Sequence, residues 1–163
     1  ALGLGIPANT FTGLLLISAI VFGIFISISG VYADKIGRRK WLIWVTVAVG
    51  VLGLTMPFFL ENGTPMSVFA FLVIGMAIMG MTFGPMAALL PELFPTEVRY
   101  SGASLAYNLA SIIGATIAAM ISLKINASFG VMGVGIYLAI NALITLLALL
   151  ASKETKNVDL TQI

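Results

Sequence analysis

Charged residues are placed so unevenly along this chain that they leave five long uncharged stretches. These stretches cover residues 1–33, 41–60, 62–91, 100–123 and 125–152. Because a helix rises 1.5 Å per residue, about 20 residues cross the roughly 30 Å hydrocarbon core of a bilayer. Each stretch is long enough to do so. The pattern therefore predicts an all-α membrane protein with five transmembrane helices.

Turn signals set the expected limits of these helices. A basic run at 34–40, a Gly- and Pro-containing turn at 61–65 and a two-proline segment at 91–95 separate the first four helices. Polar residues and a glycine at 124–130 separate the last two. We expect spans at about 11–33, 41–60, 66–90, 101–123 and 131–151, followed by a tail at 152–163.

Composition excludes several classes of function. The chain is 60% hydrophobic and only 9% charged, against roughly 25% charged in a soluble domain. Five spans leave no room for a soluble catalytic domain, so we expect no enzyme. Cysteine and histidine are absent, so disulfides, thiolate metal sites and imidazole chemistry are excluded, and we expect no cofactor or metal. The cations lie in loops, which does not suit nucleic-acid binding.

Basic residues predict the orientation. One set of loops, together with the tail, carries seven cations, whereas the other set carries only Lys124. The seven are Lys35, Arg38, Arg39, Lys40, Arg99, Lys153 and Lys156. Cytoplasmic loops are enriched in Lys and Arg, so we expect the tail in the cytoplasm and the first residue outside the plasma membrane. An odd number of spans and a start without Met or signal features suggest that the chain is cut from a longer protein.

The most informative motif is the loop between the first two spans, which reads G-x-x-x-D-K-x-G-R-R over residues 30–39. Gly30 allows another helix to approach the end of its span, and Gly37 permits a tight turn. Asp34 is placed to accept hydrogen bonds from Arg38 or from a helix N-terminus. Composition alone would equally allow an ordinary basic cytoplasmic loop.

The spacing of this motif resembles the loop signature of the major facilitator superfamily, found between the second and third helices and again between the eighth and ninth. A second string, over residues 84–108, contains E-L-F-P-T-E-V-R-Y-S-G-A-S-L. It is similar to the junction of the tenth and eleventh helices of the metabolite:proton symporters, which carry shikimate, 2-oxoglutarate, citrate, proline or betaine. The resemblance implies that the chain is helices eight to twelve of a twelve-helix carrier. The chain departs from this pattern at 114–119, which lacks a proline that relatives often have.

The resemblance implies a conformational latch at the cytoplasmic face. In this superfamily two six-helix halves rock about a central site. Opposite charges that pair in one state and separate in the other would close and open the inner side. The expected latch residues are Gly30, Asp34, Gly37, Arg38, Arg39, Glu92 and Arg99. The alternative is that these charges are merely solvated among lipid headgroups.

Small residues in the fourth span recur every four positions and favour close helix packing. They are Gly102, Ala106, Ala110, Gly114 and Ala118. Each step turns 400°, so the series drifts around the helix as a diagonal rather than a straight seam. Gly80 and Gly84 in the third span offer a matching close-approach site. Pro85 follows them and predicts a kink or flexible point.

Polar residues in the same span share one face and are candidates for a substrate cavity. Ser104, Tyr107, Asn108 and Ser111 fall at i, i+3, i+4 and i+7. Such a face points to a partner helix or to a water-filled cavity, and both interpretations stay open. Ser18, in the middle of the first span, is a weaker candidate on the same grounds.

These patterns together predict a secondary active transporter. We expect proton-coupled symport of a small organic acid or zwitterionic metabolite, working in the bilayer with a missing N-terminal half. No Asp, Glu, Lys or Arg lies inside the five expected spans, so the proton as coupling ion rests on the resemblance alone. A sugar-type carrier or uniporter is the alternative within transport. A truncated protein that carries nothing and acts through a partner is the alternative outside it.

Overall fold

The computed structural model describes residues 6–61 and 64–152, and each element in them is a helix. Short breaks at a glycine, a turn or a proline-containing loop divide the chain. The helices are α1 (Ala8–Ile36), α2 (Arg38–Leu60), α3 (Pro65–Glu92), α4 (Arg99–Ile112), the π-helical turn η1 (Ile113–Ile117) and α5 (Ala118–Ala151). The all-α prediction is therefore confirmed for the described residues.

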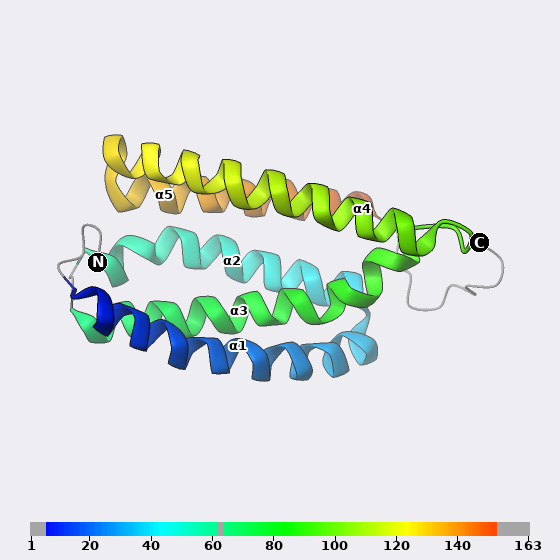
Figure 1. Cartoon of the computed structure of the whole chain (residues 1–163), viewed down its shortest axis with the longest axis horizontal. Coiled ribbons are helices and arrows are strands. Elements are labelled where there is room, and N and C mark those ends of the chain that lie inside the picture. Colours follow the sequence, from blue (N-terminus) through cyan, green and yellow to red (C-terminus); the bar gives the residue numbers. More distant parts are fainter. Residues whose placement is uncertain (1–5, 62–63, 153–163) are drawn as a thin grey trace.

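The helices lie side by side in two groups: α1, α2 and α3 form the first, and α4, η1 and α5 form the second (Figure 1). α1 packs against α3, and α2 packs against both α3 and α5. α4, η1 and the part of α5 before Gly130 form one helical run that crosses the molecule, and the rest of α5 returns antiparallel to it (Figure 1). The reversal occurs at Gly130, whose φ of 65° and ψ of −164° lie outside the helical region. Glycine adopts this positive φ without a Cβ penalty, so one residue makes the turn.

Four helices of the described chain are long and apolar enough to cross a membrane: α1, α2, α3 and the run Arg99–Ala151. The fourth and fifth expected spans both fall on this last run of 53 residues. The expected loop at 124–130 is wrong in extent, because the backbone stays helical up to Gly130. Polar residues there predicted a loop, yet a helix end exposed to water or headgroups tolerates them.

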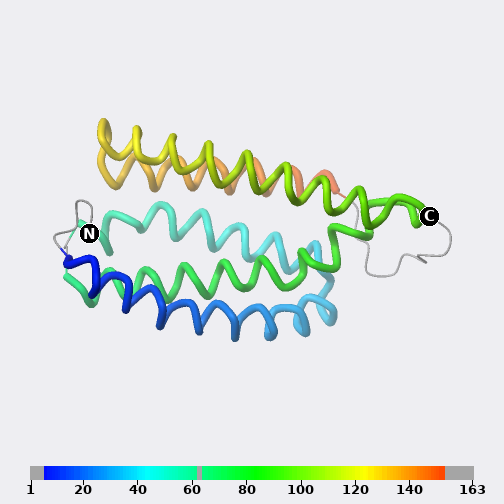
Figure 2. The backbone as a smooth tube through the Cα atoms, in the orientation of Figure 1, coloured from blue at the N-terminus to red at the C-terminus, as the bar shows by residue number. Residues whose placement is uncertain are grey.

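Two connections and the end of the last helix lie at one end of the bundle (Figure 2). These are the α1–α2 junction, the α3–α4 loop and the last residues of α5. The α1–α2 junction is the single residue Gly37, which is buried and has a φ of 112°. A side chain is strained at that φ, so the expected tight turn at Gly37 depends on glycine.

Glycines allow the closest helix contacts, and the partner helices differ from those expected. A Cβ on Gly84 would collide with Ser29 Oγ and would lie 2.6 Å from the carbonyl oxygen of Ile26. A Cβ on Gly80 would lie 2.6 Å from the carbonyl oxygen of Phe22. α1 therefore packs closely against α3 at both glycines. Their expected pairing with the small residues of the fourth span is wrong.

The small-residue series of the fourth span does not form a helix seam within the described chain. Gly102 is approached by the Phe94 ring from the preceding loop, and a Cβ added to Gly114 would meet no described atom within 4 Å. Ala110 is exposed, whereas Ala106 and Ala118 are half-buried. α4 packs against α3 alone, apart from its continuation into η1. No second helix of the described chain packs against these small residues, and the spacing alone does not show whether a partner helix is present.

Apolar side chains cover the outside of the bundle. Trp44 is 77% exposed and Phe58 74% exposed, which would be costly in water but is favourable in a bilayer. The buried core of the described residues is small and includes a cluster around Ile6, Leu60 and Val68. The exposed apolar surface and the four long helices identify a membrane protein.

Candidate functional site

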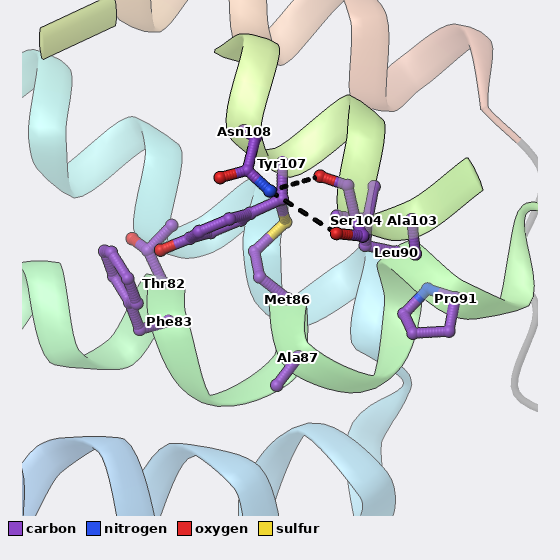
Figure 3. A pocket seen from close by; sticks show the side chains of 10 residues that line it. All are labelled: Thr82, Phe83, Met86, Ala87, Leu90, Pro91, Ala103, Ser104, Tyr107 and Asn108. Carbon is purple, nitrogen blue, oxygen red and sulfur yellow. Dashed lines mark hydrogen bonds between the residues drawn. The ribbon is translucent and has the colours of Figure 1, made fainter. Parts of the chain in front are cut away.

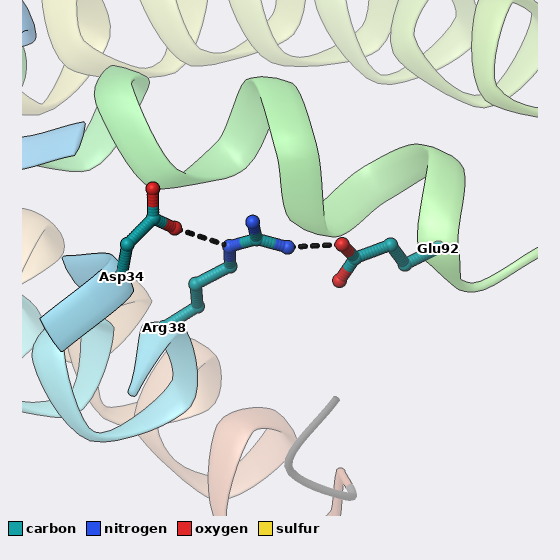
Figure 4. Close-up of polar contacts among 3 residues, drawn as sticks. All are labelled: Asp34, Arg38 and Glu92. Carbon is teal, nitrogen blue, oxygen red and sulfur yellow. Dashed lines mark hydrogen bonds and ion pairs between the residues drawn. The ribbon is translucent and has the colours of Figure 1, made fainter. Parts of the chain in front are cut away.

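Three charged residues from three helices meet at the end of the bundle where the connections gather. Arg38 Nε donates to Asp34 Oδ1 at 3.0 Å, and Arg38 Nη1 donates to Glu92 Oε1 (Figure 4). The Arg38 and Glu92 side chains are only 18% and 14% exposed, whereas Asp34 is 63% exposed. The guanidinium therefore links α1 and α2 to the last turn of α3.

Local structure explains why these groups meet. Asp34 lies in the last turn of α1 and Arg38 is the first residue of α2, so the turn at Gly37 places their side chains next to each other. Glu92 is the last residue of α3. Its helix runs antiparallel to α2, which brings its C-terminal end beside the start of α2 (Figure 1).

The other two arginines of the expected latch make different contacts. Arg39 Nε and Nη2 donate to the carbonyl oxygens of Leu149 and Leu150, each at 2.7 Å. These are among the last carbonyls of α5, which lack helical donors and carry the negative end of the helix dipole. Arg99 donates to the carbonyl oxygen of Phe94 at 3.4 Å and to Thr96 Oγ1 at 3.3 Å, within the α3–α4 loop.

The two glycines of the motif shape the backbone around this cluster. Gly37 makes the turn between α1 and α2. A Cβ added to Gly30 would meet no described atom within 4 Å, but the Gly30 backbone nitrogen would lie 2.9 Å from a Cβ on Gly84. Close approach at Gly30 therefore depends on the glycine in α3 rather than on Gly30 itself.

A pocket of about 490 Å³ lies between α3 and α4. Its lining combines apolar side chains of α3 with the polar face of α4 (Figure 3). The lining residues are Thr82, Phe83, Met86, Ala87, Leu90, Pro91, Ala103, Ser104, Tyr107 and Asn108. The pocket holds no charged side chain among these residues, which suits a neutral or internally compensated ligand better than a single unpaired ion.

The polar groups of the pocket come mainly from three residues of α4, which are Ser104, Tyr107 and Asn108. Asn108 Nδ2 donates to the Ser104 carbonyl oxygen at 2.8 Å and to Ser104 Oγ at 3.4 Å. The side-chain oxygen of Asn108 accepts no hydrogen bond from the described residues. The Tyr107 ring extends across the pocket toward α3, with its hydroxyl near Thr82 (Figure 3). Tyr107 and Asn108 therefore place polar atoms at the pocket wall, where a ligand could contact them.

The remaining cavity candidates lie elsewhere. Ser18 is fully buried in α1, and its hydroxyl donates to the Leu14 carbonyl oxygen at 2.8 Å. Ser111 is exposed on α4 and is not part of the pocket lining. The helical spacing therefore correctly grouped Ser104, Tyr107 and Asn108 at the pocket. Ser111, one turn further along α4, lies outside the pocket lining.

Sequence reasoning missed Thr82 in the pocket and the buried Ser29, whose hydroxyl donates to the Gly80 carbonyl oxygen at 3.2 Å. It also missed the contact from Trp41 Nε1 to the Met81 carbonyl oxygen, 3.1 Å long. The sequence signal for the Trp41 contact was Pro85, because a proline cannot donate to the carbonyl four residues before it, which here belongs to Met81. No group of three or more His, Cys, Asp or Glu suited to a metal ion occurs among the described residues.

The pocket and the charged cluster share one structural element. Leu90 and Pro91 line the pocket, and the next residue, Glu92, pairs with Arg38. A displacement of the end of α3 that breaks the ion pair would therefore also change the shape of the pocket. This arrangement can couple occupancy at one place to a contact at another.

Comparison with known proteins assigns the family. Residues 4–163 match the model of the family described as sugar (and other) transporter. The chain belongs to this transporter family of the major facilitator superfamily. A Haemophilus influenzae protein to which metabolite transport is provisionally ascribed is 94% identical over all 163 residues. The Escherichia coli inner membrane metabolite transport protein YhjE is 46% identical over 97% of the chain.

A more distant relative has a named substrate. The proline/betaine transporter of Salmonella typhimurium is 30% identical over 89% of the chain. The chain spans about a third of the length of these relatives: 37%, 36% and 29% respectively. No solved structure matches this chain significantly. Membership of the family makes this a transporter sequence and not an enzyme sequence.

Proposed function

We propose that this chain works as part of a secondary active transporter that moves a small metabolite by alternating access. The observation that carries the proposal is the continuity between the pocket and the Arg38–Glu92 ion pair through the end of α3. Alternating access requires a central binding space and a gate that responds to it. The shared segment supplies both.

The proposed membrane arrangement has five crossings, with Gly130 dividing the run Arg99–Ala151 into two. In this arrangement the chain provides helices eight to twelve, and the remaining helices of a twelve-helix carrier supply the other half. The end that holds the Arg38 cluster faces the cytoplasm of the plasma membrane, because Lys and Arg gather there. The α1–α2 junction, the α3–α4 loop and the last residues of α5 all lie at this end of the bundle (Figure 2).

In this proposal only two of the seven expected latch residues form the contact that opens and closes. Arg38 and Glu92 form the contact that breaks when the cytoplasmic side opens. Asp34 orients Arg38 through its 3.0 Å hydrogen bond. Arg39 fixes the end of α5, and Arg99 orders the α3–α4 loop.

The proposed substrate is a small organic acid or zwitterion that is cotransported with a proton. Tyr107 and Asn108 offer a hydroxyl and an amide to such a molecule, while Phe83 and Met86 contact its apolar part. The named substrate of the 30% identical relative, proline/betaine, supports a zwitterion. Proton coupling would use carboxylates outside the pocket lining, because that lining contains none.

A sugar-type carrier is the second candidate, and the description of the matching family, sugar (and other) transporter, favours it. The pocket separates the two classes only in part. A hexose presents many hydroxyls and needs several polar partners, whereas the pocket offers few polar side chains among its ten lining residues. That balance favours the metabolite with an apolar part.

Uptake by cells that produce the protein tests the proposal. Labelled organic acids, zwitterions and hexoses are supplied in weakly buffered medium while the external pH is recorded. The proposal expects uptake of an acid or zwitterion, alkalinisation of the medium during uptake and no competition by hexoses. Uptake of a hexose without a pH change would establish the sugar-type alternative, and no uptake of any class would refute transport by this protein.

A further inference from the structure

Pro85 leaves one carbonyl of α3 without its normal partner. A proline has no backbone N–H, so it cannot donate to the carbonyl four residues before it, which here belongs to Met81. An unsatisfied carbonyl inside a membrane protein is costly. The helix assignment nevertheless continues from Pro65 to Glu92, so another group has to compensate.

Trp41 supplies the missing donor from another helix. Its indole Nε1 donates to the Met81 carbonyl oxygen at 3.1 Å. The Tyr32 ring stacks on the indole at 5.9 Å between centroids, with 17° between ring planes. A side chain of α2, held by a ring from α1, thus replaces the hydrogen bond that Pro85 removes from α3.

The first turn of α2 consequently contacts α3 on both sides of the proline. Trp41 and Arg38 are three residues apart and share a face of α2. Trp41 binds α3 before Pro85, and Arg38 binds it at Glu92, about 16 Å further along the helix axis. Before Pro85, α1 also holds α3 through Ser29 and the close contacts at Gly80 and Gly84.

We infer that Trp41 is a positioning residue that sets the direction of the last two turns of α3. Those turns carry Ala87, Leu90 and Pro91 of the pocket and the Glu92 carboxylate of the ion pair. Trp41 thereby fixes the pivot about which the pocket wall and the latch move together. The inference rests on the proposed function only for its consequence in transport, since the hydrogen bond itself is part of the structure.

A double-mutant cycle with Pro85 tests the inference in the full protein in its own membrane. Trp41→Phe keeps an aromatic ring but removes the donor, whereas Pro85→Ala restores a backbone N–H that can reach Met81. The readout is the rate at which N-ethylmaleimide alkylates a cysteine placed at Ala87, beyond the proline. A cysteine at Thr82, in the same pocket but before the proline, serves for comparison. Protein without an introduced cysteine gives the background.

Loss of one hydrogen bond should change the alkylation rate at position 87 by roughly three- to tenfold, and at position 82 by less than about twofold. In the Pro85→Ala background Trp41→Phe should add less than about twofold. Trp44→Phe is the matched control, because Trp44 is 77% exposed, and it should leave both rates unchanged. An equal effect of Trp41→Phe in both backgrounds, or no effect at position 87, would overturn the inference.

Two further readouts keep the test decisive. If Trp41→Phe fails to accumulate in the membrane, recovery of its amount by Pro85→Ala supports the inference and lack of recovery overturns it. With a transported substrate, the half-saturation concentration should rise more than the maximal rate falls. Alkylation needs no substrate, so the double-mutant cycle can be interpreted even if the protein transports nothing. A negative result of the cycle, in turn, does not refute the proposed transport.

Discussion

At the scale of single residues, the two carboxylates around Arg38 differ in what they contribute. Asp34 is 63% exposed, so water and salt screen its attraction to the guanidinium. Glu92 is 14% exposed and joins a helix that is distant in sequence. A charge-assisted hydrogen bond in such a half-enclosed place contributes about 1.5–3 kcal/mol. Of the two carboxylates, Glu92 therefore contributes more to the binding of Arg38, and its ion pair adds to the contact between α2 and α3.

Glu92→Gln should lower the transport rate about tenfold or more, because the latch loses its charged partner. The measurement is initial uptake normalised to the amount of protein in the membrane. Glu61→Gln is the matched control, since Glu61 is exposed at the opposite end of α2. The exchanged pair Arg38→Glu with Glu92→Arg should recover part of the rate. A normal rate for Glu92→Gln would contradict the latch.

Asn108→Ala should raise the half-saturation concentration for substrate by roughly tenfold, because the pocket loses a polar contact. Asn141 provides a close control, as its Nδ2 donates to the Tyr137 carbonyl oxygen at 2.8 Å in the same i to i−4 manner. Asn141 lies outside the pocket, so Asn141→Ala should leave uptake kinetics unchanged. Equal behaviour of the two variants would show that Asn108 is only a helix contact.

At the scale of the helices, glycine decides where backbones touch. α1 and α3 approach at Gly80 and Gly84, and α2 and α5 approach at Gly53 and Gly135. A Cβ on Gly53 would lie 2.8 Å from the carbonyl oxygen of Gly135. Since lipid tails supply no hydrophobic drive between helices, such close packing has to hold the bundle together.

Gly84→Ala should destabilise the protein by about 1–3 kcal/mol, because the added methyl meets backbone and Ser29 rather than a flexible chain end. The measurement is the thermal unfolding temperature in mild detergent. Gly114→Ala is the control within a helix, since its added methyl would meet no described atom within 4 Å. It should be neutral or slightly stabilising. A lower unfolding temperature for Gly114→Ala than for Gly84→Ala would refute the assigned packing.

The helices could be predicted from the sequence because a membrane span needs about 20 uncharged residues, and the charges mark their limits. Contacts between helices could not, since small residues at regular spacing allow an approach without naming the partner. Gly80 and Gly84 show this, because they meet α1 and not the fourth span. At the site, the contact of Asp34 with Arg38 could be predicted from their opposite charges in one short loop motif, whereas the Trp41 contact depends on tertiary structure.

At the scale of the whole molecule, charge separates the two ends of the bundle. The end with Gly37 and the α3–α4 loop holds Lys35, Arg38, Arg39, Lys40 and Arg99, whereas Lys124 lies near the opposite end, before the turn at Gly130. This asymmetry is the basis for placing the first end in the cytoplasm. In the proposed function, the Arg38–Glu92 ion pair closes this side.

Cysteine substitutions at the two ends test this orientation. A cysteine at Glu61 should react with a membrane-impermeant maleimide added outside intact cells. A cysteine at Lys40, at the other end of α2, should react only after the membrane is permeabilised. Both positions are exposed, so burial does not bias the comparison. The reverse pattern of reaction would invert the proposed orientation.

The most direct test of the central claim is uptake driven by an imposed pH gradient in proteoliposomes that contain the purified protein. An inside-alkaline gradient should drive accumulation of an organic acid or zwitterion above its external concentration, and a protonophore should abolish the accumulation. Glu92→Gln should accumulate substrate about tenfold more slowly under the same gradient. Equilibration without accumulation, or accumulation that is insensitive to the protonophore, would contradict proton-coupled transport through this pocket.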